Sequence, residues 1–347
     1  MSYTKKYFFN FVSIPVFCIF ILPLLSYASS FQMKDDSPFG VCVDLDECKD
    51  ENIARLISEA GIKWIRQPIR WDYIEPKKGE FHWEGLDKAI ENEYKYGLNA
   101  YGTLHWKSWS DPTAGDDQAL KNWINFVSLA VARYKDKIKY WEVWNEEDYE
   151  GFWKPPSAAN YVKLLKATYI AAKKIDPDCK IILGGIMGWG GESPYFPFID
   201  EVYKNGGKDY FDIAAFHPYT MPYSPERNNL MRIKINDVLG RMKNNGDADK
   251  PIWITELGWP SNKLIDPASE RGVTPDQQAD YLVKAFEICL SYPQIKKVFW
   301  YCFRDVGTSP FDSEHHYGLI KNDLTPKPSY NAYKDFISKW KQANPGK

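Results

Sequence analysis

Short apolar runs rich in β-branched and aromatic residues alternate eight times with longer segments of helical period along this chain. Runs of this apolar character, each followed by a helix, predict a parallel sheet whose outer face is covered by helices. Eight such units fit an α/β fold with a single (β/α)8 TIM barrel, whose usual size is about 250 residues. We expect the strands at residues 39–44, 64–69, 99–104, 139–146, 180–185, 212–219, 251–258 and 296–305.

Amphipathic patterns between and after these runs predict the helices. We expect them at residues 51–60, 83–96, 118–134, 158–175, 199–205, 227–244, 274–291 and 329–340. In the fourth of them, apolar side chains recur at helical spacing between lysines, and Ser157 is a good N-cap. A doubly wound open sheet is the alternative fold. It usually carries a Gly-rich phosphate loop after an early strand, and no such motif opens a helix here.

Residues 1–28 are predicted to be a cleaved export signal, which leaves residues 29–347 as the barrel domain. Two lysines precede an apolar stretch at residues 7–25, and residues 26–28 place small side chains at the −3 and −1 positions of a cleavage site. The protein would then be secreted or periplasmic and free of the membrane. The alternative is an uncleaved membrane anchor, because the stretch approaches the roughly 20 residues that span a bilayer.

The cysteines beyond residue 28 are odd in number, so at least one thiol stays unpaired or pairs between chains. No C-x-x-C motif occurs, so neither a structural zinc site nor a redox motif is indicated. We expect mostly buried thiols, with Cys42–Cys48 as the locally plausible disulfide. The cysteines concerned are Cys42, Cys48, Cys179, Cys289 and Cys302.

Charge and aromatic content narrow the possible partners. The formal net charge of −2 argues against nucleic acid, because duplex binding needs a basic face that releases counterions. The 14 Trp, 23 Tyr and 19 Phe residues fit a large core and also a surface that stacks on sugar rings. The histidines lack metal-ligand spacing such as H-x-H at a strand end, so a metal-dependent hydrolase is not indicated. The oligomeric state is left open, with a monomer favoured.

Polar and aromatic side chains gather where the predicted strands end, which is where barrels of this kind carry their chemistry. Glu146 on the fourth strand and Glu256 on the seventh would face each other across the barrel mouth. Cleaving an acetal between sugars needs one carboxylic acid to protonate the leaving oxygen and one carboxylate to attack or stabilise the oxocarbenium-like centre. The other strand-end candidates are Arg66, His105, Trp106, Asn145, His217, Tyr219, Trp259, Trp300 and Tyr301.

Two segments resemble the catalytic strand ends of clan A glycoside hydrolases. They are residues 141–146 (WEVWNE) and 253–259 (WITELGW), and residues 70–76 (RWDYIEP) are similar to the segment after the second strand of that clan. The likeness runs from about residue 39 to 336 and is closest to family 39-like members, which include β-xylosidases and bacterial exopolysaccharide endoglycosidases. An Asn-Glu pair, a His-x-Tyr motif and a second Glu, in that strand order, make the resemblance specific.

The resemblance implies a retaining double displacement at β-type linkages. Glu146 would be the general acid and then the base, with a raised pKa, and Glu256 the nucleophile, with the carboxyl groups about 5–5.5 Å apart. Asn145 would hydrogen-bond the sugar 2-hydroxyl, and Arg66 and Tyr219 would hold Glu256 ionised.

His105 and His217 would line the subsite where the bond breaks. Clan members commonly place a Trp under the sugar near the end of strand eight. Trp300 and Tyr301 compete for that place, because a shift of one residue along a strand turns the side chain to the other face.

The remaining acids and tryptophans near these strand ends have structural interpretations. Glu142 is expected to be a buried, hydrogen-bonded acid, whereas Glu147, Asp148 and Glu150 are expected to be solvated loop acids. Some of the tryptophans after strand ends must belong to the core, and others are candidates for stacking on sugars. They are Trp71, Trp106, Trp109, Trp153, Trp189 and Trp259.

The sequence therefore favours a secreted retaining β-glycoside hydrolase that acts on a polysaccharide or oligosaccharide and requires no metal or organic cofactor. The alternative is a non-catalytic carbohydrate-binding barrel in polysaccharide export or recognition, which would usually have lost one of the two glutamates. The sugar, and the choice between internal and terminal cleavage, stay open. The loops at residues 107–117 and 189–196 would decide the latter.

Overall fold

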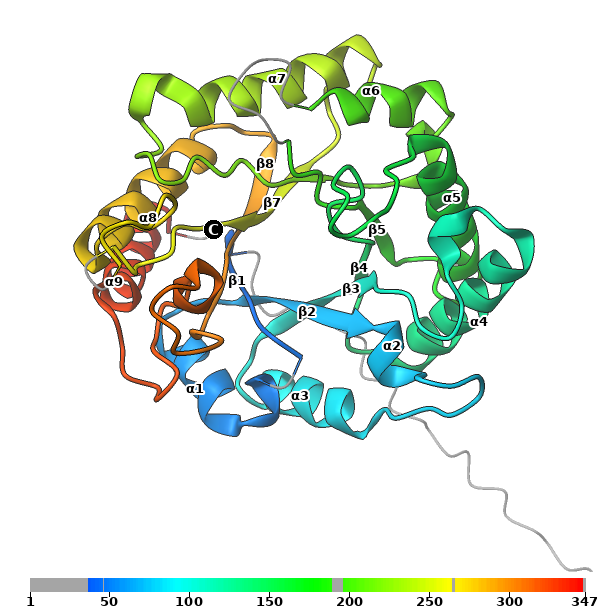
Figure 1. Ribbon diagram of the computed structural model, residues 1–347, viewed down its shortest axis with the longest axis horizontal. Helices are drawn as coiled ribbons and strands as arrows, with labels where there is room; N and C mark the ends of the chain where they lie inside the picture. Colours follow the sequence, from blue (N-terminus) through cyan, green and yellow to red (C-terminus); the bar gives the residue numbers. More distant parts are fainter. Residues whose placement is uncertain (1–36, 46, 189–195, 264–265, 346–347) are drawn as a thin grey trace, which may run out of the picture. The chain divides into compact units, whose positions relative to one another are not determined.

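The computed structural model describes residues 37–345, except 46, 189–195 and 264–265 (Figure 1). The predicted export signal lies outside the described residues, so it stays a prediction. Within the described part of the chain, no helix is both long and apolar enough to cross a bilayer.

Eight parallel strands form one sheet in the order β5-β4-β3-β2-β1-β8-β7-β6. The sheet closes between its outer strands, because the Leu183 N–H donates to the Ile213 carbonyl at 2.9 Å and the His217 N–H donates to the Ile186 carbonyl at 2.9 Å. The predicted TIM barrel is thereby confirmed over the open sheet. The strands are β1 (Phe39–Cys42), β2 (Trp64–Arg70), β3 (Asn99–His105), β4 (Tyr140–Val143), β5 (Lys180–Leu183), β6 (Ala214–Phe216), β7 (Ile252–Leu257) and β8 (Ile295–Trp300).

Helices surround the strands in Figure 1. The α-helices are α1 (Glu51–Glu59), α2 (Trp71–Ile74), α3 (Glu84–Lys95), α4 (Asp117–Tyr134), α5 (Ala158–Ile175), α6 (Pro197–Lys204), α7 (Leu230–Asn244), α8 (Pro275–Leu290) and α9 (Pro328–Ala343). The 3-10 turns are η1 (Glu47–Lys49), η2 (Pro112–Ala114), η3 (Lys208–Tyr210), η4 (Arg227–Asn229) and η5 (Ser313–His316). α5 has the predicted bounds, and the predicted N-cap Ser157 accepts from the Asn160 N–H at 3.3 Å. The expected helix at 227–244 is split, because Asn228 and Asn229 adopt positive φ.

Several strands end earlier than the apolar pattern predicts, and this shapes the mouth of the barrel. β4 ends at Val143 rather than at Glu146, because Trp144 and Glu146 have φ of 74° and 47°, in the left-handed region that leaves a sheet. β6 ends at Phe216, so His217 and Tyr219 also lie beyond their strand. The polar residues of both segments are therefore carried by the loops that leave the strands.

Apolar side chains fill the barrel on both faces of the sheet. The interior holds a cluster of aromatic rings that includes Trp64, Tyr101, Trp253 and Phe299. A larger cluster lies between the sheet and the helices. The rings inside the barrel form a packed layer below the polar strand ends, which places the chemistry of this barrel at its mouth.

All five cysteines beyond residue 28 are buried free thiols, as the sequence predicts, and the plausible Cys42–Cys48 disulfide does not form. Cys42 belongs to the cluster inside the barrel, whereas Cys48 belongs to the cluster outside the sheet. The strand separates the two thiols, so neither can reach the other.

Candidate active site

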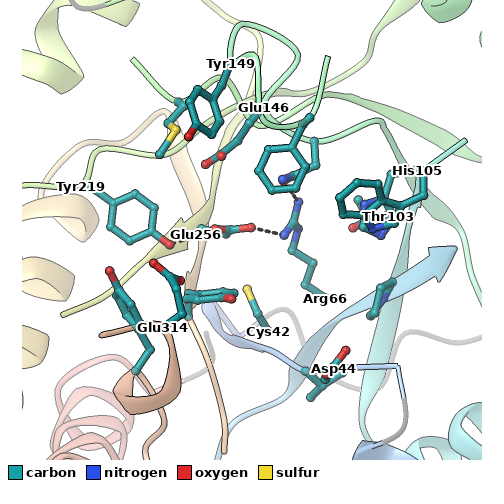
Figure 2. A pocket seen from close by; sticks show the side chains of 18 of the residues that line it. Cys42, Asp44, Arg66, Thr103, His105, Glu146, Tyr149, Tyr219, Glu256 and Glu314 are labelled. Atoms are coloured by element: carbon teal, nitrogen blue, oxygen red, sulfur yellow. Dashed lines mark hydrogen bonds and ion pairs between the residues drawn. The ribbon is translucent and has the colours of Figure 1, made fainter. Parts of the chain in front are cut away.

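A cavity of about 450 Å³ opens at the carboxyl ends of the strands (Figure 2). The structure brings together most of the side chains that the sequence predicts for the site. Those that line the cavity are Arg66, His105, Trp106, Asn145, Glu146, Tyr219, Glu256 and Tyr301. His217 lies directly behind Glu146 and has no exposed surface.

Glu256, near the end of β7, is held from two sides. Figure 2 shows Arg66 reaching its carboxylate from one direction and Tyr219 from the other. The Arg66 Nη1 pairs with Oε1, and the Tyr219 hydroxyl donates to Oε2 at 2.9 Å. A guanidinium and a phenol together compensate the negative charge of the carboxylate and fix its orientation.

Arg66 spreads its guanidinium over three acceptors. Besides Glu256, its Nε donates to Glu142 Oε2 at 2.7 Å and its Nη2 donates to Asn145 Oδ1 at 2.7 Å. The second of these bonds fixes the amide of Asn145, because the oxygen faces Arg66 and the NH2 group is left for another acceptor. Glu142 also accepts from the Thr103 hydroxyl at 2.8 Å and is fully buried, as predicted.

Glu146 lies in a different environment, although it is close to Glu256. Burial raises the pKa of Glu146 well above its ordinary value, and the charges of Glu256 and Asp148 raise it further. Its Oε1 lies 2.7 Å from His217 Nδ1, and His217 Nε2 lies 3.0 Å from the Thr255 hydroxyl. Burial, together with the charge of Arg66, lowers the pKa of His217 well below its ordinary value, so the imidazole is neutral. The site thus holds one carboxyl group whose pKa is raised and one ion-paired carboxylate.

Metal binding is the other chemistry that these side chains suggest. Ligand atoms of Glu146, His217 and Glu256 lie within 4.8 Å of one another, a spacing compatible with a metal ion. Arg66, however, already supplies the positive charge that faces Glu256. The two glutamates are therefore better suited to acid–base and nucleophilic work than to sharing a cation.

Trp300 and Trp259 do not line the cavity, which corrects their place in the predicted site. Trp300 is fully buried, its Nε1 donates to the Tyr317 carbonyl at 3.1 Å, and its ring packs against Trp259 at 5.9 Å. The Trp259 Nε1 donates to a backbone carbonyl at 2.9 Å and the ring is also fully buried. β8 ends with Trp300 turned toward the helices, so the next residue, Tyr301, faces the cavity.

The other tryptophans divide between core and mouth. Trp71 and Trp153 are fully buried, and Trp109 is half-buried against Trp71. Trp106 lines the cavity with a φ of 64°, and its ring packs against Phe152 at 5.4 Å. Trp189, with most of the 189–196 loop, lies outside the described residues.

The prediction of solvated acids after Glu146 is wrong for Glu147 and Asp148. Glu147 is fully buried, and burial raises its pKa well above the ordinary value. The side chain occupies space that Gly184 leaves open, since a Cβ there would lie 2.1 Å from Glu147 Oε2. Asp148 accepts from two backbone N–H groups after β5, Met187 at 3.0 Å and Gly188 at 3.2 Å.

Sequence reasoning missed cavity residues of two kinds: those in loops, where no periodic pattern marks an inward side chain, and Cys42, Pro68, Arg70 and Thr103, which lie on β1, β2 and β3. Arg271 after β7 and Glu314 in η5 form an ion pair of 3.1 Å at the cavity wall. The remaining ones are Cys42, Val43, Asp44, Pro68, Arg70, Thr103, Tyr149, Phe152, Met187, Met221 and Tyr317. Thr255 was also missed, although it directly precedes Glu256. Thr255 lies within the segment where the pairing of β7 with β8 shifts register, between Ile254 and Leu257, and the sequence pattern does not reveal such a shift.

Comparison with known proteins agrees with the resemblance seen in the sequence. Residues 28–184 match the model of glycosyl hydrolase family 10. The chain is 23% identical over 293 residues to endo-1,4-β-xylanase B of Thermotoga neapolitana, covering 78% of each protein. It is 25% identical over 265 residues to a β-xylosidase of Caldicellulosiruptor saccharolyticus, covering 72% of this chain and 52% of that protein.

Among solved structures, a family 39 glycoside hydrolase from Bacteroides cellulosilyticus superposes with a TM-score of 0.70 and 26% identity. The match covers 90% of this chain and 65% of that one, so the chain spans somewhat less than two thirds of the family 39 structure. The barrel, its strand-end motifs and these matches place the chain among the clan A glycoside hydrolases, with relatives of the family 39 type.

Proposed function

We propose that this chain is a retaining β-glycosidase in which Glu256 is the nucleophile and Glu146 the acid and base. The observation that carries the proposal is the contrast between the two carboxyl groups. Glu256 is paired with Arg66, whereas the pKa of Glu146 is raised by burial and by the charge of Glu256. An ion-paired carboxylate beside an acid with a raised pKa suits the attack on an acetal carbon and the protonation of its leaving oxygen.

In the first step, Glu256 Oε attacks the anomeric carbon while Glu146 gives its proton to the departing glycosidic oxygen, which leaves as an alcohol. A glycosyl ester forms on Glu256. In the second step, Glu146 takes a proton from water, and the water oxygen replaces the ester bond and frees Glu256. Ligand atoms of the two carboxyls lie within 4.8 Å, which supports this route over inversion, where carboxyls stand about 6.5–9.5 Å apart.

The cavity suits a neutral sugar, and we propose a β-linked polysaccharide or oligosaccharide of the xylan type as substrate. Each of the three arginines in the cavity wall is already paired with a carboxylate: Arg66 with Glu256, Arg70 with Asp72 and Arg271 with Glu314. An acidic sugar would have to compete with these partners. The names of the xylanase and xylosidase relatives support the same substrate class.

His105 and Asn145 supply groups that can contact sugar hydroxyls. Both ring nitrogens of His105 are buried without a hydrogen-bond partner in the described part of the chain, and the residue lines the cavity. A hydroxyl of a bound sugar can satisfy such a nitrogen once the ring turns toward the cavity. Since Arg66 turns the Asn145 amide, the NH2 group can donate to a sugar 2-hydroxyl, a contact that strengthens in the transition state.

The test is release of reducing ends from a panel of β-linked polysaccharides, including xylan and acidic exopolysaccharides, and cleavage of aryl β-glycosides. Wild type, Glu256→Gln and the control Glu150→Gln, whose side chain is exposed, are compared. We expect turnover in wild type and the control, loss in Glu256→Gln, and a first-formed product that keeps the β configuration. Turnover that survives in Glu256→Gln, or an inverted product, would refute the assignment. A glycan that binds without turnover would favour the binding barrel.

We also propose that residues 1–28 direct export and are removed. The basic start, the apolar stretch and the small residues before residue 29 support this. Sequencing the N-terminus of the protein recovered outside the cytoplasm tests it. A start at Ser29 is expected, and an intact N-terminus in the membrane fraction would contradict it.

A further inference from the structure

His217 is buried between two hydrogen-bonding partners, and the mechanism so far uses only one of them. Its Nδ1 lies 2.7 Å from Glu146 Oε1, and its Nε2 lies 3.0 Å from Thr255 Oγ1. Neither His217 nor Thr255 has exposed surface. Gly185 packs against the same edge of the ring, since a Cβ there would lie 2.0 Å from Nε2. Two partners and a tight wall therefore enclose the imidazole.

A neutral imidazole has one N–H and one lone pair, so this chain of groups can exist in two forms. In the first, Nδ1–H donates to Glu146 Oε1, and Nε2 accepts from the Thr255 hydroxyl. In the second, a protonated Glu146 donates from Oε1 to Nδ1, and Nε2–H donates to Thr255. Only the first form leaves the acid proton on Oε2, where it can pass to a glycosidic oxygen.

Counting protons distinguishes the two forms. In the first form, both ring nitrogens of His217 and the Thr255 hydroxyl are satisfied, and the remaining proton lies on Glu146, which lines the cavity. In the second, Thr255 Oγ1 is occupied as an acceptor, and its own proton finds no other acceptor in the described part of the structure. A buried donor without a partner is disfavoured by about 1–3 kcal/mol, so the first form dominates.

We propose that Thr255 is a positioning residue that fixes the Nδ1–H tautomer of His217 and thereby keeps the acid proton of Glu146 on the oxygen that faces the leaving group. Thr255 touches neither the substrate nor the reacting atoms and acts through His217. The proposal rests on the proposed function for Glu146. It adds that the residue directly before the nucleophile on β7 controls the acid on the other side of the barrel.

Replacing the hydroxyl by a methyl group tests this with little change in shape. In Thr255→Val, Nε2 has no partner in either form, so the preference for the productive form disappears. Cleavage of substrates with poor leaving groups, such as phenyl β-xyloside, needs the acid, whereas a dinitrophenyl leaving group departs without a proton. Without a preference, roughly half of the molecules hold the productive form, so we expect kcat/KM to fall about twofold more on the phenyl than on the dinitrophenyl glycoside.

Two further variants separate positioning from damage to the fold. Thr255→Ser keeps the hydroxyl and should restore the wild-type ratio between the two substrates. Thr168→Val, which removes a buried hydroxyl that accepts from Trp123 Nε1 at 2.8 Å on α5, should change both substrates alike. A loss in Thr255→Val that is equal for both leaving groups, or that Ser does not rescue, would overturn the proposal.

A measurement independent of turnover keeps the inference testable by itself. Nitrogen NMR of histidine-labelled protein reports which ring nitrogen of His217 carries the proton. We expect Nδ1–H in wild type and in Thr255→Ser, and a shift toward Nε2–H in Thr255→Val. Nε2–H in wild type would overturn the inference even in an active enzyme. If wild type is inactive on all glycosides but shows Nδ1–H, the proposed function fails and the positioning role of Thr255 stands.

Discussion

Glu93, which lies away from the active site, offers a quantitative test of how a buried acid changes the stability of this barrel with pH. The side chain, on α3, is fully buried, and the polar group beside its carboxyl is the Cys48 thiol. Burial raises the pKa of Glu93 from 4.5 to about 8, with the thiol acting in the opposite direction. The folded protein therefore keeps this proton up to about pH 8, whereas the unfolded chain releases it near pH 4.5.

The sign of the effect follows from these two pKa values. Between them the unfolded state binds fewer protons than the folded state, so the free energy of unfolding falls as the pH rises. The slope is about 1.4 kcal/mol for each pH unit, which amounts to about 5 kcal/mol over the whole interval. That is a large part of the roughly 5–15 kcal/mol that stabilises a typical domain.

Glu93→Gln removes the ionisation and keeps the shape of the side chain. Relative to wild type, the variant should gain up to about 5 kcal/mol between pH 4.5 and about 8, after a constant offset of about 1–3 kcal/mol for the new buried amide. Urea unfolding of both proteins at several pH values measures the difference. Glu91→Gln, exposed on the same helix, is the control and should stay within about 0.5 kcal/mol throughout. A difference between Glu93→Gln and wild type that does not change with pH would refute the reasoning.

Three shorter predictions concern the site and the thiols. Arg66→Lys keeps the charge but carries all its donors on one nitrogen, which cannot reach the three acceptors of Arg66. The free energy of unfolding, measured by heat and by urea, should fall by at least about 2 kcal/mol, and turnover should fall strongly. Gly185→Ala should lower kcat, because the added Cβ would displace His217. Gly240→Ala, which has open space around it on α7, should leave kcat unchanged and raise the free energy of unfolding by about 0.5–1 kcal/mol. Equal effects of the two variants on kcat and on urea unfolding would contradict this. Because the described cysteines are free, a reducing agent should leave the melting temperature unchanged, and a clear drop would reveal a disulfide.

The barrel could be predicted from the sequence because its signals are local. Each strand is a short apolar run, and each helix carries its stripe and often its cap, as α5 does with Ser157. The closure of the barrel then places Glu146 and Glu256 at one mouth, since both stand at the carboxyl ends of their strands. The strands, the helices and the position of the two glutamates can therefore be predicted from the sequence.

The rest depends on contacts between distant segments. Whether Trp300 or Tyr301 faces the cavity depends on where β8 ends, and the Tyr317 carbonyl that holds Trp300 comes from another loop. The burial of Glu147 depends on the space beside Gly184 on the neighbouring strand end. A hydrophobicity pattern contains neither the end point of a strand nor the shape of its neighbour, so the acids after Glu146 resembled ordinary loop residues.

The two glutamates lie so close that the charge of one raises the free energy of ionising the other. The position of Arg66 determines which of them keeps its proton. Its guanidinium pairs directly with Glu256, whereas at Glu146 the same charge only partly offsets the burial and the neighbouring carboxylates that raise the pKa, and it also lowers the pKa of His217. One positive charge thus stabilises the nucleophile as an anion and also keeps the imidazole from becoming a second cation that would draw the proton off the acid. This selective stabilisation of Glu256 requires the positive charge to stay on its side of the two glutamates. The planar guanidinium meets this requirement because Glu142 and Asn145 fix its position.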